Sequence, residues 1–160
     1  MTVDFNKNKK SRDRTRFLVF SGLVLLTITF VFTNPWAFRL VIGPLYLGPP
    51  FSPFLDMHGQ LASSQAWASG LDVFNQPNPL DMINRRHLGP SWMLFMGHLG
   101  LGVKHTTPLS IISIVGFLVV GFALLRPSNW LEVILGWLAM ASPAAIFAYE
   151  RANIDITLFC

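Results

Sequence analysis

The sequence is poor in charged residues. Of its 160 residues only 12% are Asp, Glu, Lys or Arg, whereas 52% are hydrophobic. An ordinary soluble domain carries about 25% charged residues, and a water-exposed surface cannot be built from half that supply. The composition therefore excludes an ordinary soluble globular domain and predicts an integral membrane protein.

Cysteine and known catalytic motifs are also scarce. Cys160 is the only cysteine, so no disulfide bond can form within the chain. The sequence has no phosphate-binding glycine loop, no Gly-x-Ser-x-Gly segment, no paired-cysteine spacing and no two histidines at i, i+4. We therefore expect no metal site and no cofactor, and no motif indicates a soluble enzyme class.

Basic residues are concentrated at the N-terminus. Six of the twelve lysines and arginines lie within residues 1–16, so the high isoelectric point describes one tail and does not indicate a nucleic-acid-binding surface. A basic tail before an apolar helix is retained on the cytoplasmic side, where anionic lipid attracts it. We expect residues 1–16 to be a cytoplasmic tail, with membrane lipid as a partner and no nucleic acid.

Long apolar runs predict the membrane spans. A span needs about 20 apolar residues, and uncharged or nearly uncharged runs cover residues 17–38, 88–103, 106–125 and 130–149. A cleavable signal peptide is the alternative for the first run. Its apolar region would be only about 7 to 15 residues long and would end in small residues, whereas this run ends in Asn34-Pro35-Trp36. An uncleaved anchor is therefore favoured.

Two of the other runs contain residues that disturb a helix. Residues 88–103 include Pro90 and three glycines after it, so a short span and a re-entrant segment both remain open. Ser142-Pro143 lies inside the last run and predicts a kink, because proline removes a helical hydrogen bond. Together the runs predict an all-α fold, a polytopic transmembrane helical bundle.

The segment between the first two runs, residues 39–87, predicts a long extracytoplasmic loop. It contains most of the prolines and the acids Asp56, Asp72 and Asp81. Residues 57–69 have helix-forming composition, with Asp56 at the expected N-cap and Gly70 where a helix should stop. We expect a short helix here that lies on the membrane surface.

The end of the chain bears on completeness and on topology. A further apolar run begins near residue 154 and stops at Cys160, so we expect an incomplete last span and a longer natural protein. If residues 88–103 cross the membrane, Arg126 lies outside and Glu150 inside. If they do not cross, these two positions exchange sides.

Two segments resemble a known enzyme family. FLDMHGQLASSQAWASGLDVFNQPNPLD, from Phe54, resembles the first extracytoplasmic loop of bacterial GT-C glycosyltransferases, especially the polyprenol-phosphate-mannose-dependent glycosyltransferase family 87. SPAAIFAYERANIDITLF, from Ser142, is similar to that family's Ser-Pro followed by Glu-Arg-Gly-Asn-Ile-Asp, with Ala152 in place of the glycine. The resemblance covers about residues 17–160 and implies a missing C-terminal half, without which this chain alone should be inactive.

The resemblance implies a function and a site. The protein would be a membrane glycosyltransferase in the bacterial inner (plasma) membrane that moves a sugar, expected to be mannose, from a polyprenyl-phosphate donor to an extracytoplasmic acceptor. Such transfer needs a base for the acceptor hydroxyl and cations for the leaving phosphate. Asp56 is the candidate base, and the candidate phosphate-binding residues are Arg85, Arg86, His87, Arg151, Asn153 and Asp155.

Each of these residues also has a simpler interpretation. Asp56 would only cap a helix, the cluster Arg85–His87 would contact lipid phosphate, and residues 150–155 would form a solvated turn between spans. The alternative function is accordingly a non-catalytic membrane subunit whose loop binds a partner protein.

Overall fold

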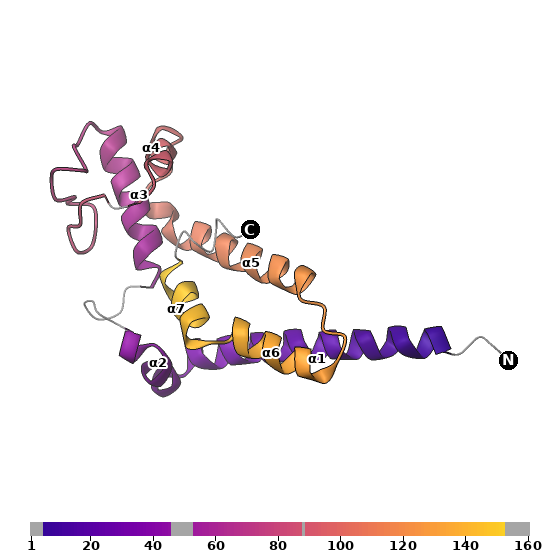
Figure 1. The fold of residues 1–160 in the computed structure, drawn as a ribbon. Helices are drawn as coiled ribbons and strands as arrows, with labels where there is room; N and C mark the ends of the chain where they lie inside the picture. The colour runs from indigo at the N-terminus through magenta and orange to yellow at the C-terminus, as the bar shows by residue number, and fades with distance from the viewer. Residues whose placement is uncertain (1–4, 46–52, 88, 153–160) are drawn as a thin grey trace. The chain divides into compact units, whose positions relative to one another are not determined.

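The structure is a computed structural model, and it describes residues 5–45, 53–87 and 89–152 (Figure 1). Within these residues the regular structure is helical throughout. The helices are α1 (Phe5–Thr33), α2 (Pro35–Val41), α3 (Leu55–Ala68), α4 (Phe95–His98), α5 (Thr106–Leu124), α6 (Trp130–Met140) and α7 (Pro143–Arg151), with 3-10 turns at Gly43–Leu45, Ser91–Leu94 and Val103–His105. The chain forms two compact units, residues 1–48 with 118–147 and residues 49–117 with 148–160.

Among the residues that the structure describes, two segments are long and apolar enough to cross a membrane, Ser11–Thr33 and Val103–Leu124. Helices α6 and α7 together meet the same criterion as a bent pair, which is either one broken span or a re-entrant loop, with a bend of 44° between them. The span expected at 106–125 therefore corresponds to α5, and the kink expected at Ser142-Pro143 is the break between α6 and α7. Large apolar side chains are exposed along these helices, among them Leu26, Ile112 and Leu131, which is typical of a membrane protein.

The first apolar run is two helices instead of one. Helix α1 ends at Thr33, and the side chain of Asn34 accepts hydrogen bonds from the backbone N–H groups of Trp36 and Ala37 at 3.0 and 3.2 Å. Asn34 thus caps α2, and Pro35 occupies the first helical position, where its missing N–H has no cost. The expected span over 17–38 is corrected to one that ends at Thr33.

The described residues 89–103 do not form a continuous helix. The described part of this run folds as a 3-10 turn and the four-residue α4, followed by a turn in which Gly100 has φ of +77°. This left-handed backbone conformation is one that glycine adopts readily and that ends a helix. The structure therefore corrects the expected span here, because four residues of helix are too short to cross a membrane.

In the first unit, α6 packs along α1. Phe20 and Val24 of α1 are fully buried, and a Cβ added at Gly136 of α6 would lie 3.0 Å from the Phe20 ring. Farther along, the indole Nε1 of Trp137 donates a hydrogen bond to Thr27 Oγ1 at 3.0 Å. The two helices run in the same direction, because Ser128, just before α6, contacts Arg16, whereas Trp137, later in α6, contacts Thr27.

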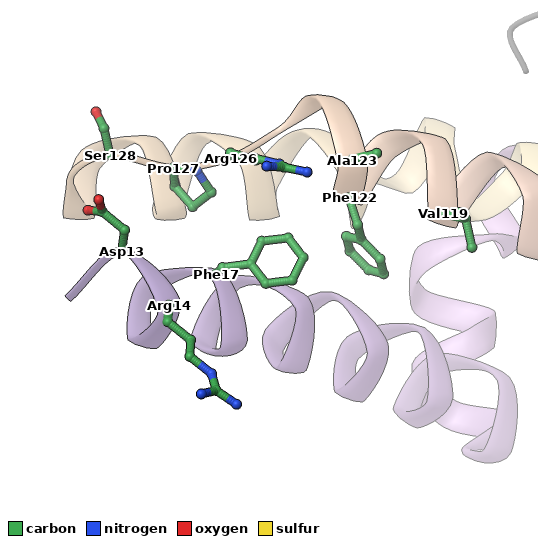
Figure 2. A pocket seen from close by; sticks show the side chains of 9 residues that line it. All are labelled: Asp13, Arg14, Phe17, Val119, Phe122, Ala123, Arg126, Pro127 and Ser128. Atoms are coloured by element: carbon green, nitrogen blue, oxygen red, sulfur yellow. The ribbon is translucent and has the colours of Figure 1, made fainter. Parts of the chain in front are cut away.

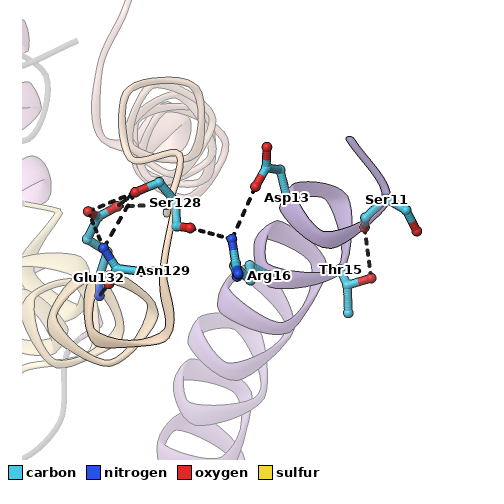
Figure 3. A network of polar contacts seen from close by, with 7 residues as sticks. All are labelled: Ser11, Asp13, Thr15, Arg16, Ser128, Asn129 and Glu132. Atoms are coloured by element: carbon cyan, nitrogen blue, oxygen red, sulfur yellow. Dashed lines mark hydrogen bonds and ion pairs between the residues drawn. The ribbon is translucent and has the colours of Figure 1, made fainter. Parts of the chain in front are cut away.

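The turn between α5 and α6 lies against the beginning of α1. Arg16 donates a hydrogen bond to the carbonyl oxygen of Ser128 and pairs with Asp13 at 3.2 Å (Figure 3). Glu132 accepts hydrogen bonds from Ser128 and Asn129, and the Asn129 side chain caps α6. The basic start of α1 and the α5–α6 turn are therefore at the same end of this unit.

In the second unit, α3 is a core helix. More than half of its residues are buried, on more than one face: Leu55, Met57, His58, Leu61, Ala62, Ser63, Ser64 and Ala66. The Ser64 hydroxyl donates to the carbonyl oxygens of Met93 and Leu94, and Gly97 packs against the Ser64 backbone without room for a Cβ. The expected surface helix is therefore corrected, because its small residues allow close packing against 91–98. Gly70, with φ of +89°, follows the end of α3 as expected.

Candidate functional site

Five charged residues of the second unit meet where α3 begins. They come from the start of α3, from the turn at residues 81–85 later in the sequence, and from the end of α7. We call them the acid–arginine cluster: Asp56, Asp81, Arg85, Glu150 and Arg151. Residues from three separate parts of the chain thus converge on one position.

Arg85 is held firmly along one edge of its guanidinium group. Its Nε and Nη2 each donate to a carboxylate oxygen of Asp81 at 3.0 Å, and Nη2 also donates to the carbonyl oxygen of Leu55 at 2.9 Å. Gly59 lies under this group and leaves no room for a Cβ. The remaining nitrogen, Nη1, faces Asp56 at the longer distance of 3.4 Å. Arg85 is therefore positioned by Asp81 and Leu55 and only loosely paired with Asp56.

Asp81 is a residue of the cluster that the sequence analysis did not assign to the site. Its side chain is 1% exposed, and it also accepts a hydrogen bond from the backbone N–H of Arg85 at 2.8 Å. Burial alone would raise the pKa of Asp81, but the hydrogen bonds and the charge of Arg85 outweigh burial and hold this pKa below its ordinary value. The side-chain hydrogen bonds that Arg85 donates to Asp81 are likewise the largest cause of a raised pKa at Arg85. The sequence did contain one signal for this ion pair, because Asp81 and Arg85 are four residues apart in a segment expected to be a loop.

Asp56 lies in the first turn of α3 and does not cap it. The N-cap is Phe54, in a left-handed conformation with φ of +63°, and no side chain caps the helix. The expected N-cap is therefore corrected. The side chain of Asp56 is 34% exposed, and its Oδ1 lies 3.4 Å from Arg85 and 3.8 Å from Arg151. The structure thus brings Asp56 within reach of Arg85 and Arg151, while its catalytic role stays a prediction.

The end of α7 is tied to the start of α3 through backbone and side chains. The Phe54 N–H donates to the Glu150 carbonyl oxygen at 2.7 Å, and the Glu150 carboxylate pairs with Arg151 Nε at 3.3 Å. The side chains of Glu150 and Arg151 are 3% and 11% exposed. They therefore do not form the solvated turn that was the simpler interpretation of this segment. Burying an ion pair is costly unless its partners compensate.

The remaining predicted residues are placed differently. Arg86 is exposed, next to Arg85. His87 is buried against the ring of Phe74, with ring centroids 5.4 Å apart, and the backbone N–H of His87 donates to the Val73 carbonyl oxygen. Burial lowers the pKa of His87, with partial opposition from the backbone of Gly89 and Pro90. Asn153 and Asp155 lie outside the described residues. Of the three basic residues at 85–87, only Arg85 thus joins the cluster.

The geometry limits what the cluster can do chemically. Charge-assisted N–H···O hydrogen bonds are typically about 2.7–2.9 Å long, so the contacts of Asp56 at 3.4 and 3.8 Å are weak. An incoming anion could replace Asp56 at both Nη1 atoms while Asp81 and Glu150 keep the two guanidinium groups in place. Asp56 would then be an accessible carboxylate beside a bound anion.

Comparisons with protein-family models, curated proteins and solved structures gave no match to this chain.

Proposed function

We propose that the protein is a membrane glycosyltransferase of the GT-C type that transfers a sugar, expected to be mannose, from a polyprenyl-phosphate donor to an extracytoplasmic acceptor. The observation that carries the proposal is the contact between Asp56 and Arg151. These residues belong to the two segments that separately resemble the family, and they are far apart in the sequence. A shared site is the simplest reason for two such segments to meet.

A second observation supports the resemblance of the later segment. The family pattern has glycine where this chain has Ala152, and Ala152 is fully buried with φ of +44°. Glycine adopts this left-handed region readily, whereas alanine does so at a cost of roughly 1 kcal/mol or more. The backbone of this chain thus has at Ala152 the conformation that a glycine would favour.

In the proposed reaction, the acceptor hydroxyl attacks the anomeric carbon of the sugar. The bond between that carbon and the donor phosphate oxygen breaks, and the polyprenyl phosphate leaves with the electron pair. The Asp56 carboxylate takes the proton of the hydroxyl, and Arg85 and Arg151 stabilise the charge on the leaving phosphate. Arginine suits this role because its planar fork of donors matches phosphate geometry.

The alternative, a non-catalytic membrane subunit, is favoured by one observation. Three carboxylates in the cluster face two arginines, and every member has a charged partner. Such a network can simply hold α3, the turn after it and α7 together. The two functions differ in what Asp56 does, because a structural network depends on Asp81 and Glu150 more than on Asp56.

We further propose a membrane topology in which the N-terminus and the α5–α6 turn lie on the same side of the membrane. The contact of Arg16 with Ser128 and the absence of a continuous helix over the described residues 89–103 support it. With the N-terminus cytoplasmic, Arg126 lies inside, and Asp56, Arg85 and Arg151 lie outside. This is the second of the two arrangements that the sequence left open.

Cysteine labelling should divide single-cysteine variants into two groups. In a Cys160→Ser background, Ser11→Cys and Ser128→Cys should react with a membrane-impermeant maleimide only after permeabilisation of the inner membrane, whereas Gln76→Cys should react in intact cells. All three positions are exposed in the structure. Labelling of Ser128→Cys together with Gln76→Cys in intact cells would contradict the topology.

Arg85→Lys should mainly weaken use of the donor. Lysine keeps the positive charge but cannot span both Asp81 and a phosphate, so we expect KM for the polyprenyl-phosphate sugar to rise about tenfold with a smaller change in kcat. The matched control is Lys104→Gln, an exposed cation of the same unit outside the cluster, which should leave both constants unchanged. Steady-state transfer by the full-length protein measures them, and equal KM values for Arg85→Lys and wild type would exclude phosphate binding by Arg85.

A further inference from the structure

A groove lies in the first unit between the beginning of α1 and the end of α5. It has a volume of about 670 Å³ and is lined by Asp13, Arg14, Phe17, Val119, Phe122, Ala123, Arg126, Pro127 and Ser128. Figure 2 shows the rings of Phe17 and Phe122 between the two helices, with the charged residues nearer the α5–α6 turn. The ring centroids are 6.4 Å apart. The groove is thus polar at one end and apolar at the other.

A second apolar groove begins at the same turn. It has a volume of about 420 Å³, shares Arg126 and Pro127 with the first, and continues along Phe20, Leu135 and Ala139. Two apolar grooves that diverge from one cationic point have the shape of a lipid with two acyl chains and one headgroup.

The charges at this turn favour an anionic headgroup. Arg14 and Arg126 are exposed and make no ion pair among the described residues, while the acids nearby are engaged. Asp13 pairs with Arg16, and the Glu132 carboxylate accepts hydrogen bonds from Ser128 and Asn129. In Figure 2 the Arg126 side chain extends along α5, whereas the Arg14 side chain projects from α1 on the side away from α5. Arg126 is therefore the cation that faces the groove at its polar end, and Arg14 lines the rim.

We propose that these two grooves form a binding site for an anionic diacyl phospholipid, with Arg126 at the lipid phosphate and the acyl chains along Phe17–Phe122 and Phe20–Leu135. The polar end follows directly after α5 ends at Leu124 and precedes the uncharged part of α1. It is therefore where the membrane–water boundary of the two helices falls. This site is separate from the acid–arginine cluster and does not depend on the glycosyltransferase proposal.

Native mass spectrometry of the purified protein in mild detergent tests the site. With equal amounts of phosphatidylglycerol and phosphatidylcholine added, wild type should retain phosphatidylglycerol preferentially. Arg126→Gln should lower this retention about fivefold, since one arginine near anionic lipid contributes on that order. The matched control is Arg12→Gln, which removes another exposed arginine, in α1, that does not line the groove, and it should change retention less than twofold.

A second variant tests whether lipid binds in the groove or is only attracted to the basic N-terminal tail. Ala123→Trp fills the apolar part of the groove and leaves every charge in place, so retention of both lipids should fall. Ala123→Leu fills it with a smaller side chain, and circular dichroism verifies that both variants keep their helix content. Equal losses in Arg12→Gln and Arg126→Gln, or unchanged retention when Ala123 is enlarged, would overturn the site. Unchanged retention would also result if protein instead of lipid fills the groove.

Discussion

Asp81→Ala should lower the free energy of unfolding by about 3 kcal/mol, the scale for breaking a buried ion pair. The substitution removes the acceptor of three hydrogen bonds from Arg85, two from its guanidinium group and one from its backbone N–H. Arg85 then lacks its main partner, and the turn after α3 loses its connection to the start of that helix. Thermal unfolding of the detergent-solubilised protein, followed by circular dichroism, measures the loss.

The effect of Asp81→Ala should depend on pH in a defined direction. The pKa of Asp81 lies below its ordinary value in the folded protein, because the hydrogen bonds and charge of Arg85 outweigh the opposing effect of burial. The stabilisation by Asp81 is therefore present above the unfolded-state pKa of about 3.9 and is lost as the pH falls through the lower folded-state pKa. The difference between wild type and variant should shrink below about pH 4.

The control for this prediction is Asp72→Ala. Asp72 also accepts hydrogen bonds within a turn, from Asn75 and Phe74, but it has no charged partner there among the described residues. Its removal should shift the unfolding midpoint little. If Asp72→Ala and Asp81→Ala were equally destabilising, the ion pair with Arg85 would not be the cause.

The sequence predicted the elements that depend on local patterns. The uncharged run of α5, the break at Ser142-Pro143 and the helix stop at Gly70 each follow from residues within one or two helical turns. Asn34-Pro35 is a local signal as well, an N-cap followed by proline, but the apolar residues on both sides of it favoured one continuous span.

The burial of α3 and the role of Asp81 could not be predicted from local patterns. Ser64 is buried because it bonds to the carbonyl oxygens of Met93 and Leu94, about thirty residues later. Asp81 belongs to the site because the turn returns Arg85 to the start of α3. Such pairings depend on how distant segments pack, whereas hydrophobic periodicity reports only which face of a helix is apolar.

Asp56→Asn should lower the turnover rate of sugar transfer by about 100-fold or more, the usual scale for loss of a general base. Asparagine has nearly the same size but does not accept a proton from the acceptor hydroxyl. Stability should hardly change, because Asp56 does not cap α3 and its ion pairs are long and partly exposed. Arg85 and Arg151 also keep their partners Asp81 and Glu150.

The matched control is Asp72→Asn, an acid of the same unit outside the acid–arginine cluster. It should keep the wild-type turnover rate, so that a loss in Asp56→Asn reflects its position and not the removal of one negative charge. A structural role for Asp56 predicts the reverse pattern, in which the unfolding midpoint falls and the turnover rate per folded molecule stays the same.

The most direct measurement is transfer of radiolabelled mannose from polyprenyl-phosphate mannose in vesicles that contain the full-length protein. We predict transfer by wild type and by Asp72→Asn, and a rate about 100-fold lower for Asp56→Asn at equal amounts of folded protein. Equal rates for wild type and Asp56→Asn would remove Asp56 from the mechanism, and no transfer by wild type would favour the non-catalytic membrane subunit.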